Sequence, residues 1–431
     1  MKFLLKNKNF LYLFLGRIVT NMGDSLYYVA SMWLVYELGK SSFYTGLAGF
    51  LILLPKAMQF LLGPFVDRWR IKKTLVITQI LQSVLILIIP ISYLFGFLSI
   101  QLILIVMPII AFIEEFAYPT QTKALPLILS KSELIKGNSL FSFAYQGVDL
   151  VFNALAGIFV AAVGAICLYV VDSITFAMAA IFFSLLKVTQ NADQSSKEEK
   201  HRKLSIKAYL KKLTEGFSIV FNSLLWVFLV GSSIANFCIG MTMAILPSFS
   251  DILGGVEMYG VLLTTLSAGS FIGALLGSFL GKYRVGILSI VCFTLGACCW
   301  TSAALVSSPI LSTLLFGLAW IPIGAVNVLI AGVSQSVIPN RVLGRVNSVM
   351  YSLSVIVMPI GSLLGGYLAT IVNSKIIFAF TGVGVLCISI VWLVHPALRA
   401  LPKGEEMSAK TFRLNFEEQN IFVLERGTHK F

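Results

Sequence analysis

The sequence predicts an all-α polytopic membrane protein with about twelve transmembrane helices in two lobes of six. Three observations lead to this fold class: an apolar composition, long stretches without charge, and a repeat between the two halves. Of the 431 residues, 58% are hydrophobic and 12% are charged, whereas a soluble domain carries about 25% charged residues. A bilayer core about 30 Å thick takes roughly 20 apolar residues per helix, so this length accommodates about twelve spans. Residues 74–113 contain no charge at all, which excludes the polar alternation of a β-barrel.

Charged or Gly/Pro/Ser-rich breaks divide the apolar sequence into twelve segments. The expected spans are 10–36, 43–65, 74–95, 99–122, 138–162 and 166–187, followed by 221–248, 257–281, 286–306, 309–334, 346–371 and 375–395. We therefore expect an N-terminal lobe over 1–187, a cytoplasmic linker over 188–220, a C-terminal lobe over 221–396 and a cytoplasmic tail over 397–431.

The linker contains one amphipathic segment. Four apolar residues share a helical face opposite Lys207, Lys211 and Lys212: Ile206, Tyr209, Leu210 and Leu213. This pattern favours a helix lying on the inner leaflet. The alternative is a frayed linker with accidental periodicity.

The net charge of +13 would suggest nucleic acid in a soluble protein, but the basic residues are sorted by side of the membrane. The outer loops hold only Lys40 and Lys375. The inner segments hold most others, including Lys2, Lys6, Lys8, Arg68, Arg70, Lys72, Lys73, Lys123, Lys131, Lys136, Lys282, Arg284, Arg341 and Arg345. Because short cytoplasmic loops are positive, we expect a multi-pass protein of the cell membrane with both termini cytoplasmic and no nucleic-acid partner.

The two predicted lobes resemble each other in sequence. Three turn residues of the first half recur at equivalent places in the second: Gly46, Gly63 and Arg68 correspond to Gly260, Gly277 and Lys282. Likewise, Asn138-Ser139 corresponds to Asn347-Ser348. Repeated halves around a long central loop are typical of a transporter with a midplane cavity between its lobes.

The loop between the second and third spans carries a family motif. It reads Gly63-Pro-Phe-Val-Asp67-Arg68-Trp-Arg70-Ile-Lys-Lys, which resembles the signature of the major facilitator superfamily. The sequence departs from that signature at Arg70 and Ile71, where the family commonly has glycine and arginine. The resemblance implies the major facilitator fold and a cytoplasmic gate formed by Gly63, Asp67, Arg68 and Arg70.

Further stretches resemble the macrolide-efflux-like, drug/proton antiporter branch. These are residues 17–24 with 33–38, 171–173, 335–339 and 344–348. The resemblance implies export of an amphipathic small molecule, drug or macrolide-like, in exchange for protons, with no cofactor beyond the proton gradient. The expected partners are this substrate, protons and membrane lipid, and the expected state is a monomer. The glycine-proline motif of antiporters is incomplete, because residues 147–157 contain no proline. Lysophospholipid or siderophore transport by the same fold is the alternative.

Ionisable side chains at membrane depth are costly and therefore candidates for function. All of them lie in the first half. The candidates for proton coupling are Asp24, Glu114, Glu115, Asp149 and Arg17, and the first half also holds Lys56 and Asp172. For Asp172 a structural role is favoured over a coupling role.

The first span carries a polar stripe of Arg17, Asn21, Asp24 and Tyr28 at helical spacing. Asp24, held near Arg17 through Asn21, would change protonation during transport. The alternative is a static ion pair, with Arg17 extending to the inner surface.

Glu114 and Glu115 diverge by about 100° on a helix, so only one can point squarely into a cavity. Their proximity suits proton carriage or attraction of a cationic substrate, whereas a structural pairing with Lys56 is the alternative. Which of the two faces the cavity stays open.

Aromatic and amide side chains suit a bulky amphipathic ligand. The candidates for substrate binding are Asn21, Tyr28, Phe112, Tyr145, Asn236, Trp320 and Asn327. The alternative for the aromatic members is packing or contact with lipid. Gly269, Gly273, Gly277 and Gly281 recur every four residues, which predicts close helix packing.

Other function classes find little support in the sequence. The three histidines, His201, His395 and His429, are too scattered for a catalytic or metal site, and no nucleotide motif is present. The six cysteines lack metal or redox spacing and are expected to be packing residues. An enzyme is therefore not expected, while a non-transporting sensor or a scramblase would share the fold.

Overall fold

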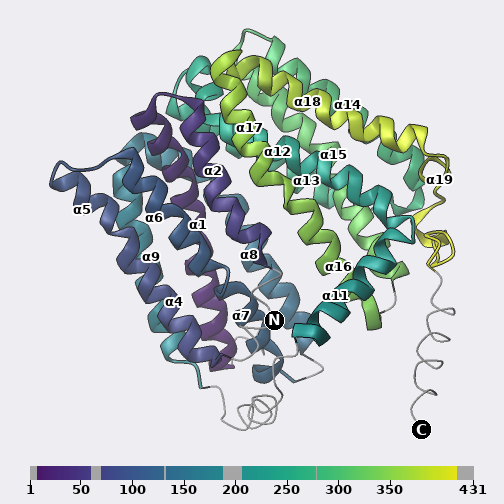
Figure 1. The fold of residues 1–431 in the computed structure, drawn as a ribbon, viewed down its shortest axis with the longest axis horizontal. Coiled ribbons are helices and arrows are strands. Elements are labelled where there is room, and N and C mark those ends of the chain that lie inside the picture. The colour runs from purple at the N-terminus through teal and green to yellow at the C-terminus, as the bar shows by residue number, and fades with distance from the viewer. Residues whose placement is uncertain are drawn as a thin grey trace.

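The structure, a computed structural model, describes residues 7–59, 69–130, 133–187, 206–277, 279–338 and 340–414. Within these residues the secondary structure is helical, apart from one isolated bridge between Arg284 and Lys403. Figure 1 shows two groups of helices, the first half of the chain in purple and blue and the second in teal, green and yellow.

The first half contains eight described helices. They are α1 (Lys8–Gly39), α2 (Ser42–Ala57), α4 (Ile71–Ile86), α5 (Ile88–Leu94), α6 (Ile100–Glu114), α7 (Ala117–Ile128), α8 (Leu134–Val163) and α9 (Ala165–Ser184). Side chains cap several of these helices, and Asn7 accepts hydrogen bonds from the backbone N–H groups of Asn9 and Phe10 at the start of α1.

The second half is described together with the helix of the linker, α11. Its helices are α11 (Ile206–Phe221), α12 (Leu225–Leu253), α13 (Val256–Gly277), α14 (Val285–Leu305), α15 (Pro309–Val337), α16 (Asn340–Val355), α17 (Val357–Ile371), α18 (Ser374–Val394) and α19 (Pro396–Arg399). Two short 3₁₀ turns, η2 (Leu280–Lys282) and η3 (Gly404–Glu406), complete it.

Nine helical segments of the described residues are long and apolar enough to cross a membrane. They match nine of the predicted spans. The helices α1, α2 and α8 occupy the three other predicted positions, and part of the predicted second span lies outside the described residues. The chain is thus a multi-pass integral membrane protein with an all-α fold.

Three predicted spans are each broken into two helices. The breaks lie between α4 and α5, α6 and α7, and α16 and α17. In each case a proline, Pro90, Pro119 or Pro359, is the third residue of the second helix. A proline lacks the N–H that would bond the carbonyl four residues earlier and clashes with that carbonyl, so the helix ends there.

The two halves touch mainly through the helix pairs α2–α17 and α8–α13. Glycines allow this approach: Gly46 lies against the backbone of Gly366, and Gly157 lies against the backbone of Gly260. Gly46 and Gly260 are equivalent positions of the sequence repeat, as are Gly157 and Gly366. The repeat therefore produces two related contacts.

These contacts lie toward the end of the molecule that carries the α1–α2 turn, here called the turn end. Three hydrogen bonds join the halves there: Tyr36 Oη to Asp251 Oδ2 at 2.9 Å, Thr45 Oγ1 to the carbonyl of Ala244 at 2.6 Å, and Ser362 Oγ to the carbonyl of Gly46 at 3.1 Å. Toward the opposite end, here called the linker end, α4 and α9 spread away from α14 and α18 (Figure 1).

The linker contains the predicted helix, since α11 spans Ile206–Phe221 and packs on α16. The side chains of its predicted apolar face, residues 206–213, lie outside the part of the chain that the structure describes.

The predicted tail is not separate from the lobe over its first part. Leu398, Leu401, Phe412 and Leu414 are buried, and the carbonyl of Phe412 accepts a hydrogen bond from the N–H of Leu224. Residues up to Leu414 therefore pack on the C-terminal lobe, because their apolar side chains find buried positions at its linker end.

The glycine stripe of α13 has the packing role predicted from its spacing. Gly269, Gly273 and Gly277 lie against the backbone of α15, where no side chain would fit. Close packing of α13 on α15 is confirmed at these three glycines, whereas Gly281 lies beyond α13 in η2 and makes no such contact.

Candidate functional site

Five carboxyl groups gather in the N-terminal lobe. Asp24 on α1 interacts electrostatically with Glu114 of α6, Asp149 of α8 and Asp172 of α9, and also with Arg17 on its own helix. Four different helices therefore contribute residues to one cluster.

Glu114 and Glu115 lie at the break that Pro119 produces. Glu114 is the last residue of α6 and Glu115 follows it as the C-cap. Glu114 interacts with Lys56, Arg17 and Asp149, whereas Glu115 interacts with Glu114 and Lys56. Glu114 thus joins the cluster directly and Glu115 joins it through its neighbour and Lys56.

Asp149 is fixed by a neighbouring hydroxyl. Its Oδ1 accepts a hydrogen bond of 2.9 Å from Ser25 Oγ on α1. Asp149 also interacts with Arg17 and Lys56. Two basic side chains, Arg17 and Lys56, therefore serve several carboxyl groups at once.

Arg17 is buried, with 2% of its surface exposed. Its Nη1 donates to Gln121 Oε1 at 3.5 Å, and its guanidinium lies 5.0 Å from the centre of the Tyr118 ring. The alternative in which Arg17 extends to the inner surface is wrong, because α7 supplies both an amide oxygen and an aromatic ring beside it.

The two other members of the α1 stripe have different surroundings. Asn21 is buried, and its Nδ2 donates to the carbonyl of Ala144 on α8 at 3.2 Å. Tyr28 is half-buried and interacts with Lys56 and with Tyr259 of α13. Asn21 therefore ties α1 to α8, while Tyr28 lies where the two lobes meet.

Asp172 is fully buried against α1. Its Oδ1 accepts a hydrogen bond from Thr175 Oγ1 at 3.0 Å, and both groups fill the space beside Gly23 where a side chain would stand. Its Oδ2 has no hydrogen-bond partner within the described part of the chain. The signal for this contact was Gly23, directly before Asp24.

A second polar network was not predicted from the sequence. Thr20 Oγ1 donates to Gln79 Oε1 at 3.0 Å, and Gln79 Nε2 donates to Gln82 Oε1 at 3.0 Å. All three side chains are buried between α1 and α4. The available signal in the sequence was the presence of uncharged polar residues inside the predicted spans.

Several predicted site residues lie outside this cluster. Gly63, Asp67 and Arg68 of the gate lie outside the described residues, as does the side chain of Tyr145. Arg70 is exposed before α4, where its carbonyl accepts hydrogen bonds from the N–H and Oγ1 of Thr74. Phe112 is 47% exposed, and its ring contacts Phe116, which stacks on Trp69.

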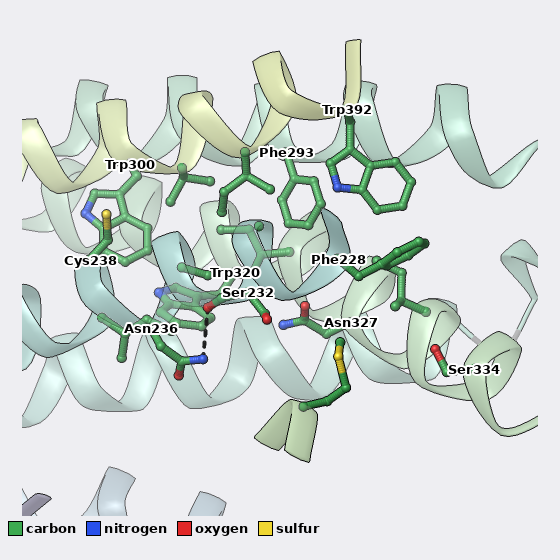
Figure 2. A pocket seen from close by; sticks show the side chains of 18 residues that line it. Phe228, Ser232, Asn236, Cys238, Phe293, Trp300, Trp320, Asn327, Ser334 and Trp392 are labelled. Atoms are coloured by element: carbon green, nitrogen blue, oxygen red, sulfur yellow. Dashed lines mark hydrogen bonds between the residues drawn. The ribbon is translucent and has the colours of Figure 1, made fainter. Parts of the chain in front are cut away.

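The C-terminal lobe contains a cavity of about 260 Å³. Its aromatic wall consists of Phe228, Phe293, Trp300, Trp320 and Trp392, from α12, α14, α15 and α18. In Figure 2, Trp300, Phe293 and Trp392 lie along one side, and Asn236, Ser232 and Asn327 lie along the opposite side. The structure thus brings together three predicted substrate-binding residues, Asn236, Trp320 and Asn327.

Among the described residues, no group of three or more His, Cys, Asp or Glu side chains could hold a metal ion. The six cysteines are free. The described residues instead contain a cluster of carboxyl groups in one lobe and an uncharged aromatic cavity in the other.

A sequence model of the Major Facilitator Superfamily matches residues 13–361. The chain belongs to this superfamily. Its members are transporters and not enzymes, and they require no cofactor. Two relatives from Bacillus subtilis (strain 168) are each 24% identical: the uncharacterised MFS-type transporter YvqJ, with 87% of this chain and 89% of the relative covered, and the uncharacterised MFS-type transporter YkuC, with 96% of both.

Solved transporters share the fold at low sequence identity. A bacterial homologue of the human lysosomal transporter Spinster, in an inward-facing and unoccupied conformation, is 13% identical with a TM-score of 0.65, covering 94% of this chain and 97% of that one. The nucleoside transporter NupG is 12% identical with a TM-score of 0.68, covering 89% and 98%. These similarities support the two-lobed major facilitator fold.

Proposed function

We propose that this transporter exports an amphipathic small molecule, drug or macrolide-like, from the cytoplasm in exchange for protons. The observation that carries the proposal is the cluster of Asp24, Glu114, Glu115, Asp149 and Asp172, with which two cations of the described residues, Arg17 and Lys56, interact. Charged groups at membrane depth are costly, so five carboxyl groups beside two cations gain from binding protons. Proton binding and release then couple the cluster to a proton gradient.

The arrangement of the lobes supports alternating access. The halves are joined at the turn end and spread apart at the linker end. With both termini cytoplasmic, as the basic inner loops favour, the linker end faces the cytoplasm of the cell and the molecule is open to the inside. In this state the acid cluster would exchange protons with the cytoplasm.

The 63–73 loop would form the cytoplasmic gate. Gly63 permits close approach of the lobes, and Asp67, Arg68 and Arg70 would pair across the interface in one state only. We expect Asp67→Asn to bias the protein toward inward-open states and to slow transport without loss of folding. Normal transport together with unchanged distances between labelled lobes would reject this gate.

The coupling role is tested with Asp24→Asn in proteoliposomes that carry an imposed pH gradient. The cargo panel contains a macrolide (erythromycin), an organic cation (ethidium), a ferric siderophore and a lysophospholipid. We expect the variant to lose uphill export while keeping downhill exchange, because the cavity remains and only its charge cycle is lost. Glu37→Gln, which neutralises an exposed carboxylate on the same helix, is the matched control and should export normally.

The same assay separates coupling from a structural ion pair. A structural role for Asp24 predicts lower thermal stability with coupling preserved in the surviving protein. Export that continues after the pH gradient is dissipated, or that an Na⁺ gradient alone drives, would refute proton coupling. Asp149→Asn and Glu115→Gln extend the test to the other helices of the cluster.

A further inference from the structure

The cavity of the C-terminal lobe is formed by that lobe alone. All of its lining residues come from the second half of the chain, and Asn327 at its edge is exposed. A pocket for a whole drug-sized ligand has about 300–1,000 Å³, so about 260 Å³ accommodates a compact group of one or two rings. A larger cargo would have to extend out past Asn327.

The lining sets the charge of the occupant. Every lining residue is uncharged, and the walls are largely aromatic and aliphatic. Burying an unpaired charge among such side chains is costly, while a flat aromatic group would pack against the rings of Trp300, Trp320 and Phe293. The cavity therefore favours a neutral aromatic group.

Two buried hydrogen-bond donors belong to side chains of the cavity wall. The Nε1 atoms of Trp300 and Trp320 have no acceptor within the described part of the chain, and these side chains are only 1% and 8% exposed. Their rings lie 5.4 Å apart, and both nitrogens lie at the end of the cavity where Cys238 and Asn236 are found (Figure 2). A buried donor without an acceptor costs free energy, which an oxygen atom of a ligand would recover.

The edge of the cavity offers different groups. Asn236 Nδ2 donates to the carbonyl of Ser232 at 2.9 Å, so its Oδ1 remains available as an acceptor. The side chain of Asn327 forms no hydrogen bond with the described residues and lies on the exposed side. The edge can therefore bind polar atoms of a ligand that continues toward the space between the lobes.

We propose that this cavity binds a neutral aromatic group carrying a hydrogen-bond acceptor, such as a carbonyl oxygen, that pairs with the indole N–H groups of Trp300 and Trp320. This proposal specifies the chemistry of the cargo, and it rests on the function proposed above because it takes the molecule bound in the cavity to be the cargo. The acid cluster would then drive the cycle without contacting this part of the cargo.

The test uses benzophenone, which is neutral, has two rings and one carbonyl, and labels nearby C–H bonds on irradiation. The full-length protein in lipid nanodiscs is irradiated at increasing benzophenone concentration, and the labelled peptides are identified by mass spectrometry. We expect saturable labelling of peptides from α12, α14, α15 and α18. Two competitors are compared for their ability to reduce this labelling: diphenylmethane, which has a methylene group in place of the carbonyl, and benzophenone analogues that keep the carbonyl. Diphenylmethane should compete about two- to tenfold less well.

Trp300→Phe and Trp320→Phe each remove one N–H and keep an aromatic ring, so each should reduce the preference for the carbonyl compound. Trp226→Phe changes an exposed tryptophan away from the cavity and is the matched control. Asn327→Leu, at the exposed edge, should weaken labelling without disturbing the packed wall. Unsaturable labelling of lipid-facing residues only, or equal competition by the two compounds, would overturn the proposal.

This measurement is independent of proton coupling. Saturable labelling of the cavity in a protein whose export ignores the pH gradient would sustain this proposal and refute proton coupling. Proton-driven export with no labelling of the cavity would refute this proposal and sustain proton coupling.

Discussion

A methyl group at Gly366 should force the two lobes apart at the turn end. The Cβ of an alanine there would lie 2.6 Å from the Cα of Gly46 and 2.9 Å from its nitrogen, whereas ordinary contacts are 3.4–4 Å. Both neighbouring atoms belong to the backbone of α2, so no side chain can turn aside. The helices must therefore separate by about 1 Å.

The size of the effect follows from this overlap. Inserting a methylene group into a well-packed contact costs about 1–3 kcal/mol. The cost is confined to the state in which the turn end is closed, because the two glycines separate in the opposite state. The ratio of the two states should thus change about 5- to 150-fold toward opening of the turn end. Gly260→Ala, whose Cβ would lie 2.8 Å from the Cα of Gly157, should act in the same direction.

Spin-label distances between the lobes measure this change. Labels at Leu38 and Ile252, which are 43% and 53% exposed near the turn end, replace the native side chains in a cysteine-free protein. Gly366→Ala should add a longer distance, and Gly332→Ala should add none, because nothing lies within 4 Å of the Cβ at Gly332. A folded Gly366→Ala protein with the parent distance distribution would refute the reasoning.

Two further predictions concern the linker end. Phe412 is 1% exposed and stacks on Phe228 at 5.5 Å, so Phe412→Ala should destabilise the C-terminal lobe by about 3–5 kcal/mol, measured by thermal unfolding in detergent; an unchanged Tm would contradict this packing. The hydroxyl and then the backbone N–H of Ser130 donate to the Glu133 carboxylate and lower its pKa. The pKa of Glu133 in the folded protein lies below its ordinary value. These hydrogen bonds therefore stabilise the folded state at pH above the ordinary pKa, and this stabilisation is lost as the pH falls through the folded pKa. Ser130→Ala should raise the pKa of Glu133 in an NMR titration, and an identical titration curve would contradict the interaction.

The span positions followed from the sequence because the bilayer imposes a length and requires each helix to satisfy its own backbone hydrogen bonds. The interior breaks did not follow, although Pro90, Pro119 and Pro359 were visible. A proline in a membrane helix is often tolerated, so its presence alone does not say that the helix ends. The packed segment up to Leu414 was missed because its apolar residues are too few for a span.

The candidate site could be predicted only in part. Asp24, Glu114 and Asp149 stood out because a charge within an apolar segment is rare, and the structure joins them. Their neighbours come from distant parts of the chain, so no local sequence pattern predicts that Ser25 donates to Asp149 or that Gln121 accepts from Arg17. Trp300 and Trp392 were missed because these helices are apolar all around, which removes the periodicity that would mark an inner face.

The separation of the acid cluster from the aromatic cavity leaves a physical requirement for coupling. A change of charge in one lobe alters the other only through an element with two arrangements that both sites bias. Tyr28 lies between the two lobes, since it interacts with Lys56 of the cluster on one side and with Tyr259 of α13 on the other. Tyr259 is buried, stacks on Trp33, and directly precedes Gly260, whose backbone lies against Gly157. A shift of Lys56 on proton exchange would therefore act on the same contact that holds the turn end closed.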